Sequence, residues 1–150
     1  MNEAAVRPVV TVATIVEREG RYLVVEEETS DGIRLNQPAG HLEAGESLTT
    51  AAARETLEES AWRVLPTALV GIYRWRARAD SATFVRFAFA ADAIEPVAGR
   101  ALDTGILRAL WLSYDEIVRR RHEHRSHLVL SCLDYYRAGR RYPLQLLVEL

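Results

Sequence analysis

The chain has 150 residues, of which 49% are hydrophobic, and a formal net charge of −2. This length and composition predict a single domain over residues 1–150, and the small net charge argues against a nucleic-acid polymer as a partner. Cys132 is the one cysteine, so no disulfide is expected within the chain. The N-terminal sequence lacks a signal-peptide pattern, and no apolar run is long enough for a membrane helix. We therefore expect a cytoplasmic protein with no membrane partner; the sequence predicts no oligomeric state.

The first third of the chain predicts strands. β-Branched residues indicate a strand over residues 9–16, and the polar turn at 17–20 followed by residues 22–25 indicates a hairpin. The run Glu26 to Glu28 is interpreted as a solvated strand end, with a substrate-facing carboxylate as the alternative. Pro38 favours an extended approach through residues 35–39 to Gly40.

The rest of the chain mixes helices and strands. Ser47 is the predicted N-cap of a helix over about residues 48–60. Strands are expected at 65–76 and 83–92, with a turn around Asp80 and Ser81, then a loop over 93–105 and a strand at 107–112. The pattern Ser113 to Glu116 is typical of a capping box that opens a short helix to about residue 121. Ser126 is the predicted cap of a last helix that ends at Gly139.

The predicted helix 48–60 carries three glutamates on one face. Glu55, Glu58 and Glu59 are spaced i, i+3 and i+4, so their side chains share an arc of roughly 100°. Like charges at this spacing repel, and anions are disfavoured near the end of a helix. A divalent cation would reverse this penalty, because carboxylate oxygens are ligands for Mg²⁺ or Mn²⁺.

The stretch from residue 40 to residue 62 resembles the Nudix box, G-x5-E-x7-R-E-U-x-E-E-x-G-U, where U is a bulky aliphatic residue. The matching positions are Gly40, Glu46, Arg54, Glu55, Glu58 and Glu59. Three positions differ from the pattern: Thr56 and Trp62 replace aliphatic residues, and Ala61 replaces a glycine that commonly ends a helix. None of the three supplies a metal ligand.

The resemblance implies an α/β Nudix fold, a mixed β-sheet sandwiched between helices. It implies that Glu55, Glu58, Glu59 and the Gly40 carbonyl hold the metal. It also implies that Glu46 and Arg54 form a salt bridge that supports the site. A carboxylate outside the box often completes such sites, and Asp103 is the candidate by position. Glu55 is the alternative base, and Glu43 is either a site residue or a polar loop residue.

Other residues are candidates for the substrate. Arg74 and Arg86 suit phosphate binding through their guanidinium groups, with a structural ion pair as the alternative. Trp75 or Tyr73 can stack on a planar ring, although core packing is the simpler interpretation. The basic stretch over residues 119–125 is interpreted as a solvated helix end, with steering of an anionic substrate as the alternative.

Further runs extend the resemblance to the NudJ-type phosphatase branch of the family, over most of residues 8–146. This implies a Mg²⁺-dependent hydrolase of nucleoside tri- and diphosphates, or of a small pyrophosphate such as hydroxymethylpyrimidine pyrophosphate. Water activated by the metal would attack phosphorus. The alternatives are a hydrolase of oxidised or sugar-linked nucleotides and a noncatalytic nucleotide-sensing module.

Overall fold

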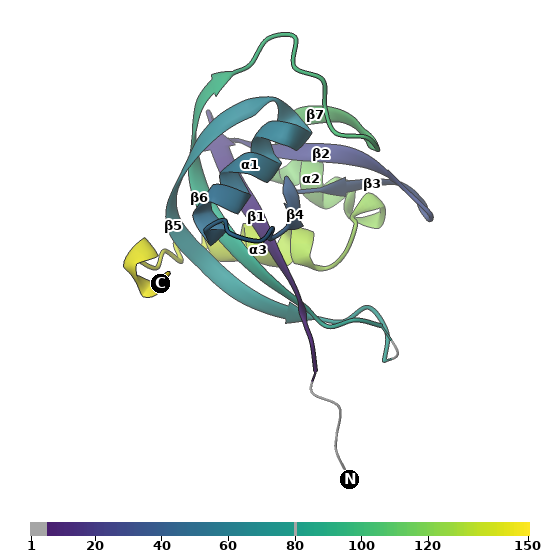
Figure 1. The fold of residues 1–150 in the computed structure, drawn as a ribbon. Coiled ribbons are helices and arrows are strands. Elements are labelled where there is room, and N and C mark those ends of the chain that lie inside the picture. Colours follow the sequence, from purple (N-terminus) through teal and green to yellow (C-terminus); the bar gives the residue numbers. More distant parts are fainter. Residues whose placement is uncertain (1–5, 80) are drawn as a thin grey trace.

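The computed structural model describes residues 6–79 and 81–150, in which seven strands form a mixed sheet with helices on both faces (Figure 1). Asp80, part of the predicted turn, lies outside the described residues. The strands are β1 (Val9–Arg18), β2 (Arg21–Thr29), β3 (Gly32–Asn36), β4 (Ala39–His41), β5 (Trp62–Trp75), β6 (Phe84–Pro96) and β7 (Ile106–Ser113). The helices are α1 (Leu48–Ser60), α2 (Tyr114–Arg119) and α3 (Leu128–Arg137), with short 3₁₀ turns η1 (Arg121–Glu123) and η2 (Leu144–Leu146).

The sheet opens into two halves that meet at the β1–β2 hairpin. The strand order is β3-β2-β1-β6-β5, and β1 runs parallel to β6. β1 and β2 pair only next to their turn, through Glu17 with Tyr22 and Arg18 with Arg21. Away from the turn, β1 pairs with β4, whereas β2 pairs with β3 and β7. The chain therefore crosses from one half to the other between β3 and β4, immediately before Gly40.

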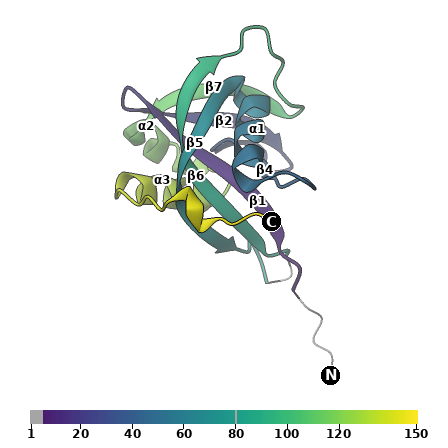
Figure 2. The ribbon, with the colours of Figure 1, turned by 60° about the vertical axis from the view of Figure 1, so that its left-hand side comes forward.

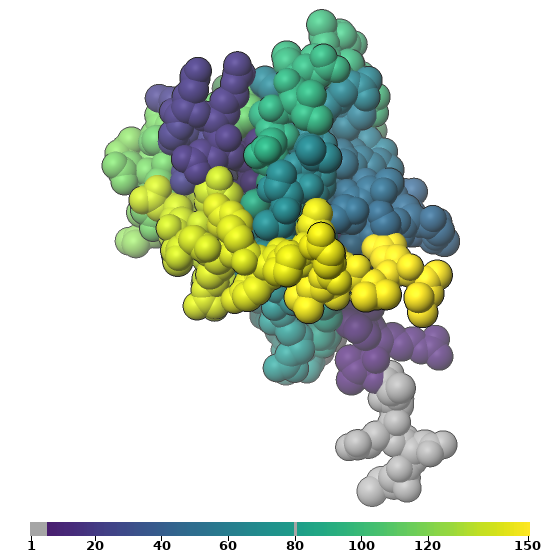
Figure 3. Space-filling view, turned by 90° about the vertical axis from the view of Figure 1, so that its left-hand side faces the viewer, coloured from purple at the N-terminus to yellow at the C-terminus, as the bar shows by residue number. Residues whose placement is uncertain are grey.

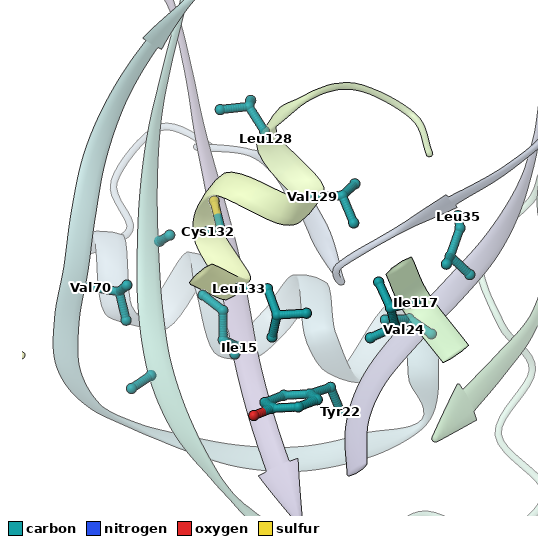
Figure 4. Packing of buried hydrophobic residues seen from close by; sticks show 12 residues of the cluster. Ile15, Tyr22, Val24, Leu35, Val70, Ile117, Leu128, Val129, Cys132 and Leu133 are labelled. Carbon is teal, nitrogen blue, oxygen red and sulfur yellow. The ribbon is translucent and has the colours of Figure 1, made fainter. Parts of the chain in front are cut away.

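The two faces of the sheet carry separate hydrophobic clusters. On one face α1 packs against Val12, Leu69 and Phe89. On the other face α3 packs against a larger cluster that includes Ile15 and Val70 (Figures 2 and 4). The predicted α/β architecture, a mixed sheet between helices, is confirmed.

The side chains of β6 alternate between the two faces of the sheet. Phe87 and Phe89 contribute to the cluster under α1, whereas Ala88 belongs to the cluster under α3. Since successive side chains of a strand point to opposite faces, Arg86 lies on the α3 side. It is buried there.

The β5–β6 hairpin is longer than the sequence predicts. Trp62 pairs with Pro96, so β5 begins three residues before residue 65 and β6 extends into the predicted loop over 93–105. The pairing contains three register shifts, and each bulge breaks the two-residue periodicity on which the prediction depends. Pro66 is tolerated because β5 is an outer strand of the sheet.

The interpretation of Glu26 to Glu28 as a solvated strand end is wrong for Glu26. β2 continues to Thr29, and Glu26 is buried. Its carboxylate accepts hydrogen bonds from Arg108 at 2.8 and 3.1 Å and from Arg120 at 2.8 Å. These arginines hold the pKa of Glu26 below its usual value, chiefly through the Arg108 hydrogen bond. Both partners are distant in sequence, so the local glutamate run does not reveal them.

The caps predicted at Ser47 and Ser113 are present, whereas the prediction of Ser126 is wrong because His127 is the N-cap of α3 and makes no side-chain cap hydrogen bond. The Ser47 hydroxyl accepts a hydrogen bond from the Thr50 N–H at 3.1 Å, and Ser113 and Glu116 form the complete capping box. The Ser126 hydroxyl accepts from the Leu128 N–H at 3.2 Å, one residue before the N-cap position of α3. Of the helices in the described residues, none is long and apolar enough to cross a membrane.

The C-terminal segment crosses the outer strand of the sheet from α3 to α1 (Figure 3). Tyr142 pairs with Leu69 of β5 through two backbone hydrogen bonds of 2.8 Å. Leu144 and Leu147 pack against the cluster beneath α1. The Leu48 N–H in the first turn of α1 donates to the Glu149 carboxylate at 2.9 Å. This segment thus fixes the N-terminal end of α1 to the edge of the sheet.

Helix α1 ends on Ala61, a non-glycine residue with a left-handed backbone (φ 59°). A side chain costs about 1 kcal/mol in this conformation. We predict that Ala61→Gly raises the free energy of unfolding by about 1 kcal/mol, measured by chemical denaturation. Gly139→Ala is the matched opposite change, because Gly139 has φ 82° and no atom lies near its missing side chain. The Gly139→Ala change should lower the free energy of unfolding. A lower free energy of unfolding in Ala61→Gly would contradict the proposed strain at Ala61.

Candidate active site

Three carboxylates meet where α1 faces the loop between β6 and β7. One oxygen each from Glu55, Glu58 and Asp103 lies within 4.8 Å of the other two. The Asp103 N–H donates to the Glu58 backbone carbonyl at 2.9 Å, which holds this loop against the end of α1. The structure thus brings together two glutamates one helical turn apart and an aspartate far from them in sequence. We call these three residues the carboxylate cluster.

Gly40 lies directly against the carboxylate cluster. It pairs with Val12 of β1, and a side-chain carbon built on it would overlap the Glu55 carboxylate. The requirement for glycine here is therefore space, because any larger residue would displace Glu55. This contact places the backbone of β4 beside the acidic oxygens.

Glu59 differs from the arrangement that the sequence predicts, since it lies outside the carboxylate cluster. Its side chain is buried and accepts a hydrogen bond from the Ala39 N–H at 3.0 Å. Burial raises the pKa of Glu59 to about 8, and the charges of Glu27 and Glu55 add to the effect. Glu59 therefore supports the start of β4, close to the cluster but facing another direction.

Arg54 connects the loop before α1 to the carboxylate cluster. Its guanidinium binds Glu46 through two hydrogen bonds of 2.9 and 2.7 Å, so the predicted ion pair is present. One terminal nitrogen also donates to Glu55 at 3.0 Å and to Glu58 at 3.1 Å. Glu43 is 3.7 Å from Arg54 and its side chain is mostly exposed. Arg54 thus neutralises part of the charge that the cluster concentrates.

Burial and the neighbouring charged groups shift the pKa of Glu55. Burial raises its pKa, the Arg54 hydrogen bond lowers it, and the neighbouring Glu58 and Asp103 raise it further. The net direction is upward. A carboxylate whose negative form is disfavoured in this way gains stability when a positive charge approaches.

Thr56 occupies a position where the Nudix pattern has an aliphatic residue, and its neighbours explain the exchange. Its hydroxyl lies 2.7 Å from the hydroxyl of Thr14 on β1 and also bonds the Ala52 carbonyl. Both threonines are fully buried. The paired hydroxyls satisfy one another, so the polar residue costs little in the core and joins α1 to the central strand.

The two arginines predicted to bind phosphate differ in their exposure to solvent. Arg74 is exposed, whereas Arg86 is 7% exposed. Arg86 donates to the Gln37 side chain at 3.5 Å, and its Nε has no hydrogen-bond partner. Among the described residues no carboxylate pairs with Arg86, so the alternative of a structural ion pair is wrong within them. Phosphate binding by either arginine stays a prediction.

Trp75 lines a cavity of about 770 Å³ between the end of β5 and the N-terminal part of α3. Several residues of the predicted basic stretch line it as well, including Arg121, His124 and Arg125. We call this space the β5–α3 cavity. Tyr73 and Trp75 both pack against the hydrophobic cluster beneath α3, which agrees with the simpler interpretation of core packing, and of the two only Trp75 lines the cavity.

Sequence reasoning missed the polar residues that join the cavity to the carboxylate cluster. Glu27 pairs with Arg125 at 3.4 Å and accepts from the Asn36 amide at 3.5 Å. The Gln37 amide donates to the Val129 carbonyl of α3 at 2.7 Å. The run Glu26 to Glu28 gave one signal for Glu27, because the alternative interpretation of that run was a carboxylate that faces the substrate. No local pattern marks Asn36 or Gln37.

Comparison with known proteins agrees with this fold. The family model described as NUDIX domain matches residues 5–131. The chain is 40% identical over 141 residues to proteins named phosphatase NudJ from Shigella boydii and Escherichia coli, covering 94% of this chain and 91% of each relative. A solved NUDIX hydrolase from Nitrosomonas europaea is 46% identical and superposes with a TM-score of 0.93, covering 96% of this chain and 98% of that one. The chain belongs to the NUDIX family of hydrolases and is NudJ-like within it.

Proposed function

We propose that this protein is a Mg²⁺-dependent hydrolase of phosphoanhydrides, with Mn²⁺ as a substitute metal. Its substrates are nucleoside tri- and diphosphates or a small pyrophosphate such as hydroxymethylpyrimidine pyrophosphate, and water attacks phosphorus. The carboxylate cluster carries this proposal, because Glu55, Glu58 and Asp103 hold three acidic oxygens within 4.8 Å of one another. The name phosphatase NudJ, given to relatives 40% identical, supports release of phosphate.

The residues present suit a hard divalent cation. Mg²⁺ prefers oxygen ligands, and the cluster offers only carboxylates, with the Gly40 backbone beside them. Glu55, Glu58, Glu59 and the Gly40 carbonyl are the proposed ligands. Asp103 is proposed as a further ligand or as the base. A bound divalent cation screens the charge of phosphate oxygens and lowers the pKa of water.

The chain's own residues would orient the reacting groups. Arg54 holds Glu55 and Glu58 in place through hydrogen bonds, while Glu46 fixes the guanidinium from the other side. Burial raises the pKa of Glu55, so its carboxylate is a stronger base than that of an exposed glutamate. We propose Glu55 or Asp103 as this base. Glu43, beside Arg54 and exposed, is placed to approach the substrate.

We also propose that the protein is cytoplasmic, where small soluble metabolites are available as substrates. Its single domain spans residues 1–150 in this proposal. Solved structures of a UDP-X diphosphatase and of the NUDIX domain of Shewanella oneidensis NrtR with ADP ribose are 15% identical to this chain, and they share its fold alone.

The reaction product distinguishes the alternative enzymatic functions. Orthophosphate supports the phosphatase proposal, whereas a nucleoside monophosphate with a sugar phosphate supports a hydrolase of sugar-linked nucleotides.

Glu58→Gln tests the proposed function directly. The change removes one negative charge from the carboxylate cluster and keeps the size of the side chain. We expect a folded protein whose Mg²⁺-dependent phosphate release from a nucleoside triphosphate falls by about 100-fold or more, because loss of a supporting group alone costs 10–100-fold. The matched control is Glu95→Gln, an exposed glutamate of the β5–β6 hairpin, which should keep full activity. Unchanged turnover of Glu58→Gln at saturating Mg²⁺ would remove Glu58 from the site.

Gly40→Ala tests the close contact between β4 and Glu55. The added methyl group overlaps the Glu55 carboxylate, so this carboxylate must move. We expect the variant to fold, to lose at least about tenfold in activity, and to lose the rise in melting temperature that Mn²⁺ gives the parent protein. Gly45→Ala, in the loop after β4, meets no atom near its new side chain; its left-handed backbone (φ 81°) lowers stability slightly, but most of the activity should remain. Normal metal stabilisation in Gly40→Ala would contradict the contact.

A further inference from the structure

The β5–α3 cavity lies outside the carboxylate cluster, and its size is typical of a site for a small ligand. Its volume of about 770 Å³ falls within the range of roughly 300–1,000 Å³ for small-molecule pockets. The lining combines the aromatic face of Trp75 and the apolar Leu130 with three arginines, Arg76, Arg121 and Arg125. A pocket of this kind suits a flat, partly apolar group that carries negative charge.

The cationic side chains of the cavity are available to a ligand. Among the described residues, Arg76 and Arg121 form no ion pair. Arg125 lies 3.4 Å from the Glu27 carboxylate through its Nε, and about half of its side chain is exposed. The one carboxylate in the lining, Asp134, accepts a hydrogen bond from the Tyr114 hydroxyl at 2.9 Å. The cavity therefore presents an excess of positive charge beside an aromatic ring.

A short path of contacts leads from this cavity to the carboxylate cluster. The Arg125 N–H donates to the Leu35 carbonyl at 2.8 Å, which holds the cavity wall against the end of β3. Glu27 joins Arg125 to Asn36, and from there four residues of chain reach Gly40. A chain of that length spans at most about 14 Å. The cavity wall and Gly40 are therefore linked through Arg125, Glu27 and this short segment.

We propose that the β5–α3 cavity holds the heterocycle and the adjacent phosphate of the substrate, with the ring on Trp75 and the phosphate on Arg125. This inference rests on the proposed function, in which the terminal phosphate lies at the carboxylate cluster. It names the preferred substrates as phosphoanhydrides that carry a planar nitrogen heterocycle, as opposed to inorganic polyphosphates. Trp75 and Arg125 are then residues that determine specificity. Guanidinium binds phosphate through paired hydrogen bonds, and an aromatic ring stacks on any base.

Binding without metal tests the cavity independently of catalysis. The full-length protein in EDTA is titrated by calorimetry with AMP, CMP and inorganic phosphate. We expect both mononucleotides to bind, and Trp75→Ala and Arg125→Gln each to weaken binding by about tenfold. Trp75→Phe keeps an aromatic face and should restore most of the affinity. Arg119→Gln, an exposed arginine of the same basic stretch that does not line the cavity, should bind as the parent does.

Kinetics with Mg²⁺ separate this inference from the proposed function. Trp75→Ala should raise KM for a nucleoside triphosphate about tenfold and leave KM for inorganic tripolyphosphate unchanged, because only the nucleotide carries a ring. Arg125→Gln should raise KM for both substrates, since both offer a phosphate to the guanidinium. Parent-like mononucleotide affinity in Trp75→Ala and Arg125→Gln alike would overturn the inference, as would equal losses on both substrates in Trp75→Ala. If the parent protein binds mononucleotides through Trp75 but hydrolyses neither substrate, the proposed function fails while the cavity assignment stands.

Discussion

The arrangement of Arg54 among four glutamates is the interaction on which the site depends. Two carboxylates 4.8 Å apart repel by about 3 kcal/mol at an effective dielectric constant of 20. Arg54 offsets this repulsion by donating to Glu55 and Glu58, while its paired hydrogen bonds to Glu46 fix the guanidinium in position. Glu43 lies at the exposed side of the same group. One partly buried guanidinium thus holds the loop, the helix and the acidic oxygens together.

The divided sheet provides the space for this arrangement. Because β1 and β2 pair only beside their turn, the crossing from β3 to β4 passes between the two halves. The crossing brings Gly40 against Glu55 and places the Ala39 N–H on Glu59. Asn36, at the end of β3, contacts Glu27, and Glu27 contacts Arg125 in the lining of the β5–α3 cavity. The site and the cavity therefore share one short stretch of chain.

Local patterns predicted much of this structure, and distant contacts account for what they missed. Helix α1 and the two serine caps depend on residues within a few positions, so the sequence alone identified them. The ion pair of Arg54 with Glu46 followed from a resemblance in spacing. The burial of Glu26 and of Arg86 depends on partners or walls from other strands, which no local run reveals. The hydrogen bond between Glu59 and the Ala39 N–H could not be predicted, because β4 supplies the partner and helical periodicity describes only the helix itself.

The claim that the acidic cluster exists to hold a divalent cation can be tested by diffraction. Crystals of the protein are soaked in Mn²⁺, and anomalous data are collected at an energy where manganese scatters strongly. We predict a peak within coordination distance of Glu55, Glu58 and the Gly40 carbonyl, and its loss in crystals of Glu58→Gln. An ordered cluster with no peak at millimolar Mn²⁺, or an equal peak in the variant, would contradict the proposed metal site.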